Sequence, residues 1–294
     1  MRLNKTKLKV FEFVAVRGSV SYKEINFLRS SSKSTYPNEL VKEGFLQKDK
    51  RKFILSKNQF TLVLSNLLTE YPFLLDYLSN YGIDILSCLI KNENISLEEI
   101  SREIRLSQPS IYRYLKKLIS KQIIYKKEKN FFFNKKLWGN LYNFIMLYID
   151  YRASFFNIPS NAKIYYKDLN RAIFSLNYED DKLNKTGFSL FSQYGINLLE
   201  NEFFYKIEKK PRFNITSVLL DALRVAGSEN NESSRRRSYC FLFYKKNIDK
   251  LKKIYHPELD LLKKIFKDKG NTKIINYPTY SELIERCKEY DIKI

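Results

Sequence analysis

The stretch "SLEEISREIRLSQPSIYRYLKKLISKQII" (residues 96–124) holds two short helix patterns on either side of a polar break, "RLSQPS". Ser96 followed by Glu99 is a capping box, in which the serine caps the first helix and the glutamate returns to the amide of the cap residue. The second helix pattern is rich in Arg, Lys and Tyr. Two packed helices in an ordinary core would explain the stretch, and a second helix built to enter a DNA groove would also explain its charge.

The second helix pattern has one apolar face and one polar face. Apolar residues recur at i, i+4, i+7 and i+8, and we expect them to be buried: Ile111, Leu115, Leu118 and Ile119. The residues that we expect to contact DNA lie on the other face or at its borders: Gln108, Ser110, Tyr112, Arg113, Lys116 and Lys117. In the major groove a glutamine can pair with adenine and an arginine with guanine, whereas lysines further along the helix suit phosphates.

A similar stretch, "VSYKEINFLRSSSKSTYPNELVKEGFL" (residues 20–46), lies nearer the N-terminus. It has its own capping box, Ser21 and Glu24, then a polar break and a second helix pattern. The two stretches are offset by 75 residues at their capping boxes and by 78 at their ends, so the later copy is three residues longer through its helices. Pro37 is expected near the start of the second helix of this copy. The residues expected to contact DNA here are Lys33, Ser34, Thr35 and Asn38.

An amphipathic helix pattern precedes each copy, and a basic hairpin pattern follows each one, at residues 45–57 and 123–135. Three helices followed by a two-stranded ribbon form the winged helix-turn-helix arrangement. A solvated hairpin tip would explain any single lysine, so the prediction depends on their joint placement beside a basic helix. The tip residues that we expect to contact phosphates are Lys50, Arg51, Lys52, Lys126, Lys127 and Lys129.

The sequence predicts an α+β, multidomain chain, with two winged helix-turn-helix domains followed by a mixed α/β domain. The expected segments are a first winged helix domain at 1–58, a helical connector at 59–80, a second winged helix domain at 81–136, a connecting or dimerisation helix at 137–158, and a mixed α/β effector or partner-binding domain at 159–294. The helix pattern at 137–158 has an apolar face, formed by Leu137, Leu141, Ile145, Tyr148 and Ile149. Packing inside the chain and a homodimer interface would both explain that face.

The composition bounds the class of protein. The 294 residues carry a net charge of +21 with a pI of 9.6, which favours a polyanionic partner: nucleic acid first, and an anionic membrane surface second. A lysine-rich proteome would give the same excess. No apolar run is long enough to span a bilayer and the N-terminus lacks an apolar signal core, so we expect a cytoplasmic protein with no role at a membrane. Three scattered cysteines and one histidine predict no disulfide framework, metal site or cofactor.

The pattern changes in the C-terminal third. "KIYYKDL" and "EFFYKIE" are typical of strands, and "KTGFSLFSQYGI" and "ITSVLLDALRVAG" are typical of helices. The order of these segments after a winged helix resembles the AbiEi-like type IV antitoxin family. Thr186, Gly187 and Ser189 match the start of a helix in that family, whereas the two residues after Ser189 depart from it. The resemblance implies a repressor of its own operon, with a nucleotidyltransferase-like toxin as partner.

Catalysis is not expected. Gly227 and Ser228 superficially match a nucleotidyltransferase turn, but the paired carboxylates that hold metal ions in such enzymes do not follow them. The sequence also has no GxxxxGK[ST] and no GxGxxG motif. Arg235, Arg236 and Arg237 are expected to form a basic loop that binds phosphate or an acidic partner, with a plain solvated loop as the alternative.

These observations together predict a sequence-specific double-stranded DNA-binding transcriptional regulator, and the resemblance implies an antitoxin-like repressor. An RNA-binding accessory protein is one alternative, because the many Tyr and Phe side chains could stack on unpaired bases. A toxin-neutralising protein-interaction module with secondary DNA binding is the other.

Overall fold

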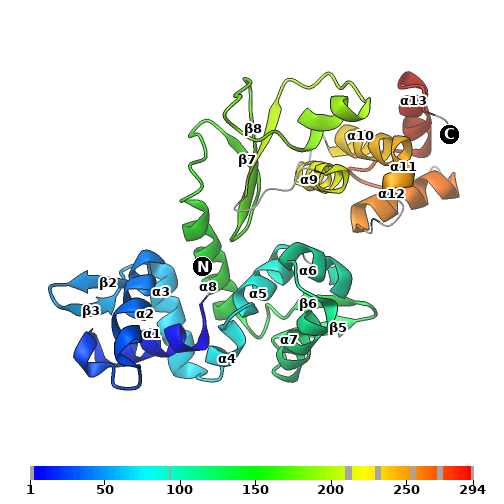
Figure 1. The fold of residues 1–294 in the computed structure, drawn as a ribbon. Helices are drawn as coiled ribbons and strands as arrows, with labels where there is room; N and C mark the ends of the chain where they lie inside the picture. Colours follow the sequence, from blue (N-terminus) through cyan, green and yellow to red (C-terminus); the bar gives the residue numbers. More distant parts are fainter. Residues whose placement is uncertain are drawn as a thin grey trace. The chain divides into compact units, whose positions relative to one another are not determined.

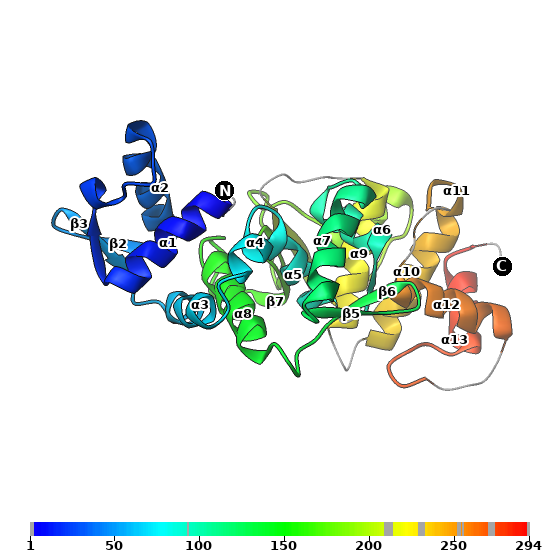
Figure 2. The ribbon, with the colours of Figure 1, turned by 90° about the horizontal axis from the view of Figure 1, so that it is seen from below.

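The computed structural model describes residues 3–92, 94–208, 214–228, 233–251, 254, 256–269 and 274–292. The chain divides into two compact units, an N-terminal unit (Met1–Tyr151) and a C-terminal unit (Arg152–Ile294) (Figures 1 and 2). The division falls inside the predicted connecting segment 137–158. No described helix is both long and apolar enough to cross a membrane.

Two modules of like topology make up most of the N-terminal unit. The elements of the first module, residues 5–55, are α1 (Lys5–Arg17), β1 (Ser19–Ser21), η1 (Tyr22–Glu24), α2 (Ser30–Lys42), β2 (Leu46–Asp49) and β3 (Lys52–Leu55). The elements of the second module, residues 82–133, are α5 (Gly82–Lys91), β4 (Ile95–Ser96), α6 (Leu97–Ile104), α7 (Gln108–Ser120), β5 (Ile124–Lys127) and β6 (Asn130–Phe133). Each module ends in a three-stranded antiparallel sheet, ordered β1-β3-β2 in the first and β4-β6-β5 in the second.

The two sheets also share one register. In the first module Val20 and Lys48 both pair with Phe53. In the second module, Ile95 and Lys126 both pair with Phe131. Each phenylalanine is buried, and each lysine lies over the ring that it pairs with, at 6.0 Å in the first sheet and 5.8 Å in the second. The offset of 75 therefore holds for the first strand of each module, and the offset of 78 holds for both wing strands.

The three-residue difference lies between the capping box and the following helix. Ser96 caps α6, which has eight residues, whereas Ser21 precedes η1, a 3₁₀ turn of only three residues. The sequence patterns predicted an α-helix at both places, and that prediction is wrong for the first module, because the shorter connection leaves room for a single turn. The polar stretch "RSSSKS" (residues 29–34), which we expected to separate the two helices, belongs mostly to the second helix, since α2 begins at Ser30.

Two residues in the helices of the modules differ from their predicted places. Pro37 lies inside α2, and the offset of 78 places it at the position of the buried Leu115. Its apolar ring is buried there, although a proline cannot donate a backbone hydrogen bond to the preceding turn. Ile119 was expected to be buried but is 36% exposed, because the buried face of α7 ends at Leu118.

The remaining helices of this unit pack between and around the modules. They are α3 (Gln59–Glu70), α4 (Leu74–Leu78) and α8 (Gly139–Ala153). The ring of Tyr148 in α8 packs against Phe45 and Phe60, and its hydroxyl donates to Glu43 at 3.2 Å. The apolar face that a homodimer would need is therefore used for packing inside the chain. Leu137 does not join that face, because α8 begins at Gly139 and Leu137 remains exposed.

Replacing Ser96 by alanine is expected to destabilise the second module by about 0.5–2 kcal/mol. The Ser96 hydroxyl accepts from the Glu99 amide at 3.3 Å, and the Ser96 amide donates to the Glu99 carboxylate at 2.8 Å. Urea unfolding followed by fluorescence of Trp138, which packs against Tyr71, measures the loss. Ser21→Ala is the matched control and should cost less, because Ser21 precedes a single turn; a larger loss from Ser21→Ala would contradict this account.

The C-terminal unit is a three-stranded antiparallel sheet covered by helices. Its sheet has the order β7-β8-β9, formed by β7 (Lys163–Lys167), β8 (Arg171–Leu176) and β9 (Phe203–Glu208). The helical elements are η2 (Gly187–Tyr194), α9 (Ile215–Gly227), α10 (Ser233–Lys246), α11 (Ile248–Leu251), α12 (Pro257–Asp268) and α13 (Tyr280–Glu289). The sequence patterns missed β8, the central strand. Five of its six residues are buried, and they lie on both faces of the strand. The strand therefore shows no alternation of polar and apolar residues.

Candidate nucleic-acid interface

Helix α7 presents a polar face that its packing holds in place. Ile111, Leu115 and Leu118 are buried, and they fix the rotation of the helix about its own axis. The residues of α7 that are exposed to solvent include Gln108, Tyr112, Arg113, Lys116 and Lys117. Five of the six predicted contact residues on this helix therefore share an accessible surface.

The first turn of α7 contains a proline and carries polar side chains. Pro109 lies in the first turn, where the backbone amides have no partner within the helix, so the missing amide costs nothing. The Ser107 and Ser110 hydroxyls lie 2.9 Å apart, which ties the sixth predicted contact residue to the cap. Gln108 and Arg113 remain available within the first two turns. Side chains at this end of a recognition helix are the ones that reach base edges.

Positive charge is concentrated in the second half of the module. Between residues 105 and 136 there are ten Lys and Arg residues and one acidic residue, Glu128. Between residues 82 and 104 there are five acidic and two basic residues. Among the described residues, Arg113, Lys116 and Lys117 form no ion pair with a carboxylate. Their charge is therefore available to an external anion.

The wing of the second module also carries exposed basic side chains. Lys126, Lys127 and Lys129 are all exposed, and Glu128 occupies the left-handed turn position with φ 56°. The wing of the first module has the same construction, with exposed Lys50, Arg51 and Lys52 and a positive φ at Lys50. The structure thus places every predicted wing residue in an exposed position in or next to a hairpin turn.

The polar face of α2 differs from that of α7. By the offset of 78, the positions of Tyr112, Arg113, Lys116 and Lys117 are occupied in α2 by Ser34, Thr35, Asn38 and Glu39. Several of these side chains are engaged inside the module. The Thr35 hydroxyl donates to the Ser31 carbonyl at 3.0 Å, and the Asn38 amide oxygen accepts from the Tyr22 hydroxyl at 3.3 Å.

The carboxylate in this set is also engaged, because Glu39 pairs with the buried Lys7 at 2.8 Å. Ser34 and Thr35 are exposed, whereas Lys33 and Asn38 are half-buried. The face of α2 that corresponds to the basic face of α7 is therefore uncharged apart from an internally paired acid.

Arg235, Arg236 and Arg237 do not form a loop. All three lie in helix α10, and the Arg236 and Arg237 side chains are buried. The Arg236 guanidinium pairs with Glu202 at 2.8 Å and Glu200 at 3.1 Å. The prediction of a basic loop for phosphate or an acidic partner is wrong for these two residues, because carboxylates within the same unit already neutralise them. Arg235 is exposed at the surface of the helix.

The pKa shifts around Arg236 and Arg237 agree with this internal pairing. Burial alone would raise the pKa of Glu202, but the hydrogen bonds from Arg236 and Tyr165 outweigh burial and hold that pKa below its ordinary value. Arg237 pairs with Glu258 at 2.6 Å and donates to the Asn276 carbonyl at 2.7 Å. Burial, together with Glu258, raises the pKa of the neighbouring Tyr277 to about 12.

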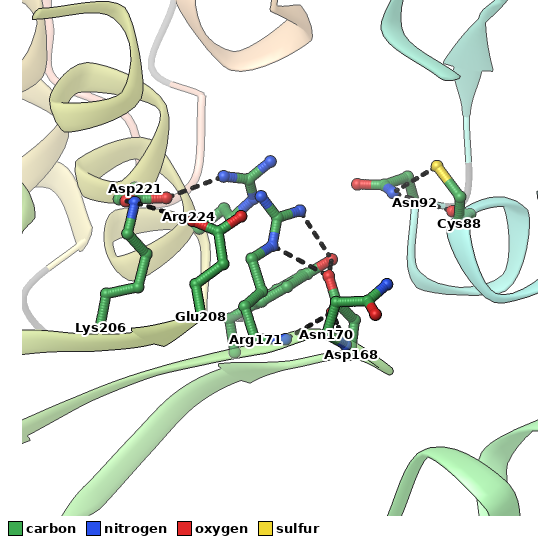
Figure 3. A network of polar contacts seen from close by, with 10 residues as sticks. Cys88, Asn92, Asp168, Asn170, Arg171, Lys206, Glu208, Asp221 and Arg224 are labelled. Atoms are coloured by element: carbon green, nitrogen blue, oxygen red, sulfur yellow. Dashed lines mark hydrogen bonds and ion pairs between the residues drawn. The ribbon is translucent and has the colours of Figure 1, made fainter. Parts of the chain in front are cut away.

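A second polar cluster lies between the sheet and α9, and sequence reasoning did not find it (Figure 3). The Asp221 carboxylate accepts hydrogen bonds from Lys206 at 2.8 Å and from Arg224 at 3.0 Å. The Thr186 hydroxyl donates to the same carboxylate at 2.7 Å. Glu208 lies 3.7 Å from Lys206. The alternation of Lys206 and Glu208 on one face of β9 was the only available sequence signal, and their partners lie on other elements.

The residues on which the resemblance to the antitoxin family rests make contacts inside the C-terminal unit. Thr186 binds Asp221, and the Ser189 hydroxyl accepts from the Phe204 amide at 2.6 Å. Gly187 has φ +53°, and a Cβ at this position would lie 3.4 Å from the Ala222 amide nitrogen. These contacts join η2 to β9 and α9. Among the described residues, no group of three or more His, Cys, Asp or Glu could hold a metal ion.

Residues 78–125 match a protein family described as winged helix-turn-helix DNA-binding. The match runs from the last residue of α4 through α5, α6 and α7 into β5. No curated protein and no solved structure matches the chain. The second module is therefore a winged helix-turn-helix domain, which suggests that the chain is a DNA-binding regulator.

Proposed function

We propose that this chain is a sequence-specific, double-stranded DNA-binding transcriptional regulator that reads the major groove with α7. The observation that carries the proposal is the exposure of basic side chains on α7, within the segment that matches a DNA-binding family, together with the exposed lysines of the wing that follows this segment. In this arrangement Gln108 and Arg113 contact base edges, and the lysines of α7 and of the wing contact phosphates.

We infer that the first module is a second winged helix with a different role in DNA binding. Its topology and strand register repeat those of the second module, which supports the assignment. Its helix α2 has no basic residue at the positions of Arg113, Lys116 and Lys117, whereas its wing keeps Lys50, Arg51 and Lys52. We therefore assign phosphate contacts to this wing and little base recognition to α2.

Replacing Arg113 by alanine should weaken binding to the preferred duplex by about 1–3 kcal/mol and relax selectivity at one base pair. The physical reason is the loss of two hydrogen bonds to a guanine edge. Selection of bound duplexes from a random library defines the preferred site, and competition binding with single-base variants measures the change. Thr35→Ala, the equivalent substitution in α2, serves as the matched control and should leave the selected sequence unaltered.

An equal loss on every sequence would show that Arg113 contacts the backbone. If no enriched sequence emerges from the selection with the unmodified chain, sequence-specific recognition itself is contradicted.

The antitoxin-like repressor role is a narrower proposal, supported only by the resemblance at Thr186, Gly187 and Ser189. It requires a nucleotidyltransferase-like toxin as partner. Co-expression with the product of the neighbouring open reading frame, followed by co-purification and a growth assay, tests the proposal. A neighbouring product that neither binds the chain nor is neutralised by it would exclude this role without affecting DNA binding.

A further inference from the structure

The outer face of the second wing carries two aromatic rings, Tyr125 in β5 and Phe132 in β6. They are paired directly across the hairpin, with ring centroids 5.2 Å apart and ring planes 7° apart. The adjacent residues Ile124 and Phe131 are buried, and side chains alternate along a strand, so this wing pair lies on the face turned away from the core. Tyr125 exposes 48% of its surface.

The hairpin does not need these rings in order to form. In the first wing, which has the same register, Gln47 and Ile54 occupy the equivalent paired positions. The inner face of the two wings is nevertheless the same, with a lysine paired to a buried phenylalanine in both. The rings are thus an addition to the outer face of one wing only, and structural need within the hairpin does not account for them.

The surroundings of the wing pair indicate the chemistry of its partner. Lys127 lies two residues after Tyr125 on the same face of β5, and Lys129 lies in the adjoining turn. Both lysines are exposed. In the described part of the sheet β5 is an edge strand, so no strand covers the side of Tyr125 away from Phe132. A flat aromatic surface flanked by cations fits a nucleobase joined to its phosphates better than it fits a protein surface.

We propose that the wing pair is a stacking platform for an unpaired nucleobase next to the duplex held by α7. The proposal rests on the proposed DNA binding of the second module. Within an intact duplex the neighbouring base pairs cover both faces of each base, so a side-chain ring can stack only on a base outside that stack. The platform therefore favours DNA that carries a single-stranded end or an unpaired base.

Fluorescence anisotropy of the full chain compares a blunt duplex with the same duplex extended by a three-nucleotide single-stranded end. The unmodified chain should bind the extended duplex about tenfold more tightly. The double variant Tyr125→Gln with Phe132→Ile introduces the pair found in the first wing, which is compatible with this register. It should bind both duplexes with the affinity of the unmodified chain for the blunt one. Tyr125→Phe, which keeps the ring, should retain the preference.

A 2-aminopurine placed in the single-stranded end reports stacking directly through a change in its emission. The change should occur with the unmodified chain and with Tyr125→Phe, and it should be lost in the double variant. Equal affinity of the unmodified chain for both duplexes would overturn the inference, as would an equal loss on both duplexes in the double variant. Failure to bind the blunt duplex at low salt would instead contradict the proposed function, even if the single-stranded end were bound.

Discussion

Raising the salt concentration from 50 to 200 mM should weaken binding of the full chain to its preferred duplex by about 10³- to 10⁵-fold. This magnitude applies to a protein that contacts about 6–10 phosphates, because each neutralised phosphate releases condensed counterions. The exposed basic residues of α7 and of the two wings are numerous enough for that count. Titrations at several salt concentrations measure the slope of log affinity against log salt.

Lys116→Gln combined with Lys117→Gln should reduce the magnitude of that slope by about 2, or about 1 for each lost phosphate contact. A control with the same loss of net charge is Lys264→Gln combined with Lys267→Gln, since both lysines are exposed on α12 of the C-terminal unit. The control should leave the slope unchanged if α7 carries the contacts. A flat salt profile of the unmodified chain would exclude the proposed mechanism.

Replacing Asp221 by asparagine should destabilise the C-terminal unit by about 3–5 kcal/mol. The Asp221 side chain is 2% exposed, and it neutralises the side chains of Lys206 and Arg224, which are 3% and 9% exposed. The amide keeps the shape of the carboxylate but leaves the two cations in a buried site without their shared counter-ion. Hydrogen–deuterium exchange of the full chain, read on peptides from β9 and α9, localises the effect.

Asp181→Asn is the matched control, because Asp181 is an exposed carboxylate in the same unit. It should change the free energy of opening, measured by exchange in β9 and α9, by no more than about 0.5 kcal/mol. Combining Asp221→Asn with Lys206→Met should cost less than the two single losses together, since the partners are coupled. Strictly additive losses would show that the Lys206–Asp221 pair contributes nothing of its own.

The sequence predicted the second module well because its signals are local. The capping box at Ser96 and the apolar spacing of Ile111, Leu115 and Leu118 depend only on neighbours within a few turns. The presence of a winged helix-turn-helix in this part of the chain is confirmed, whereas the individual DNA contacts stay predictions. The offset of 78 also described α2 and α7, whose bounds differ by that number at both ends.

The errors have separate physical causes. Arg236 looked like a loop residue because Glu200 and Glu202, which neutralise it, precede it by more than thirty residues. The strand β8 was missed because burial on both faces removes the alternation that marks a half-exposed strand. At η1 the same capping box produced a different structure, because three fewer residues follow it before the next helix.

Helices α2 and α7 have equal length and lie at the same distance from their wings, although their polar faces differ. Such a pair makes a chimera practical: the thirteen residues of α7 could replace those of α2 without a change in loop length. If α7 contacts base edges as proposed, a chain with two copies of this basic helix should prefer DNA in which the recognised motif is repeated.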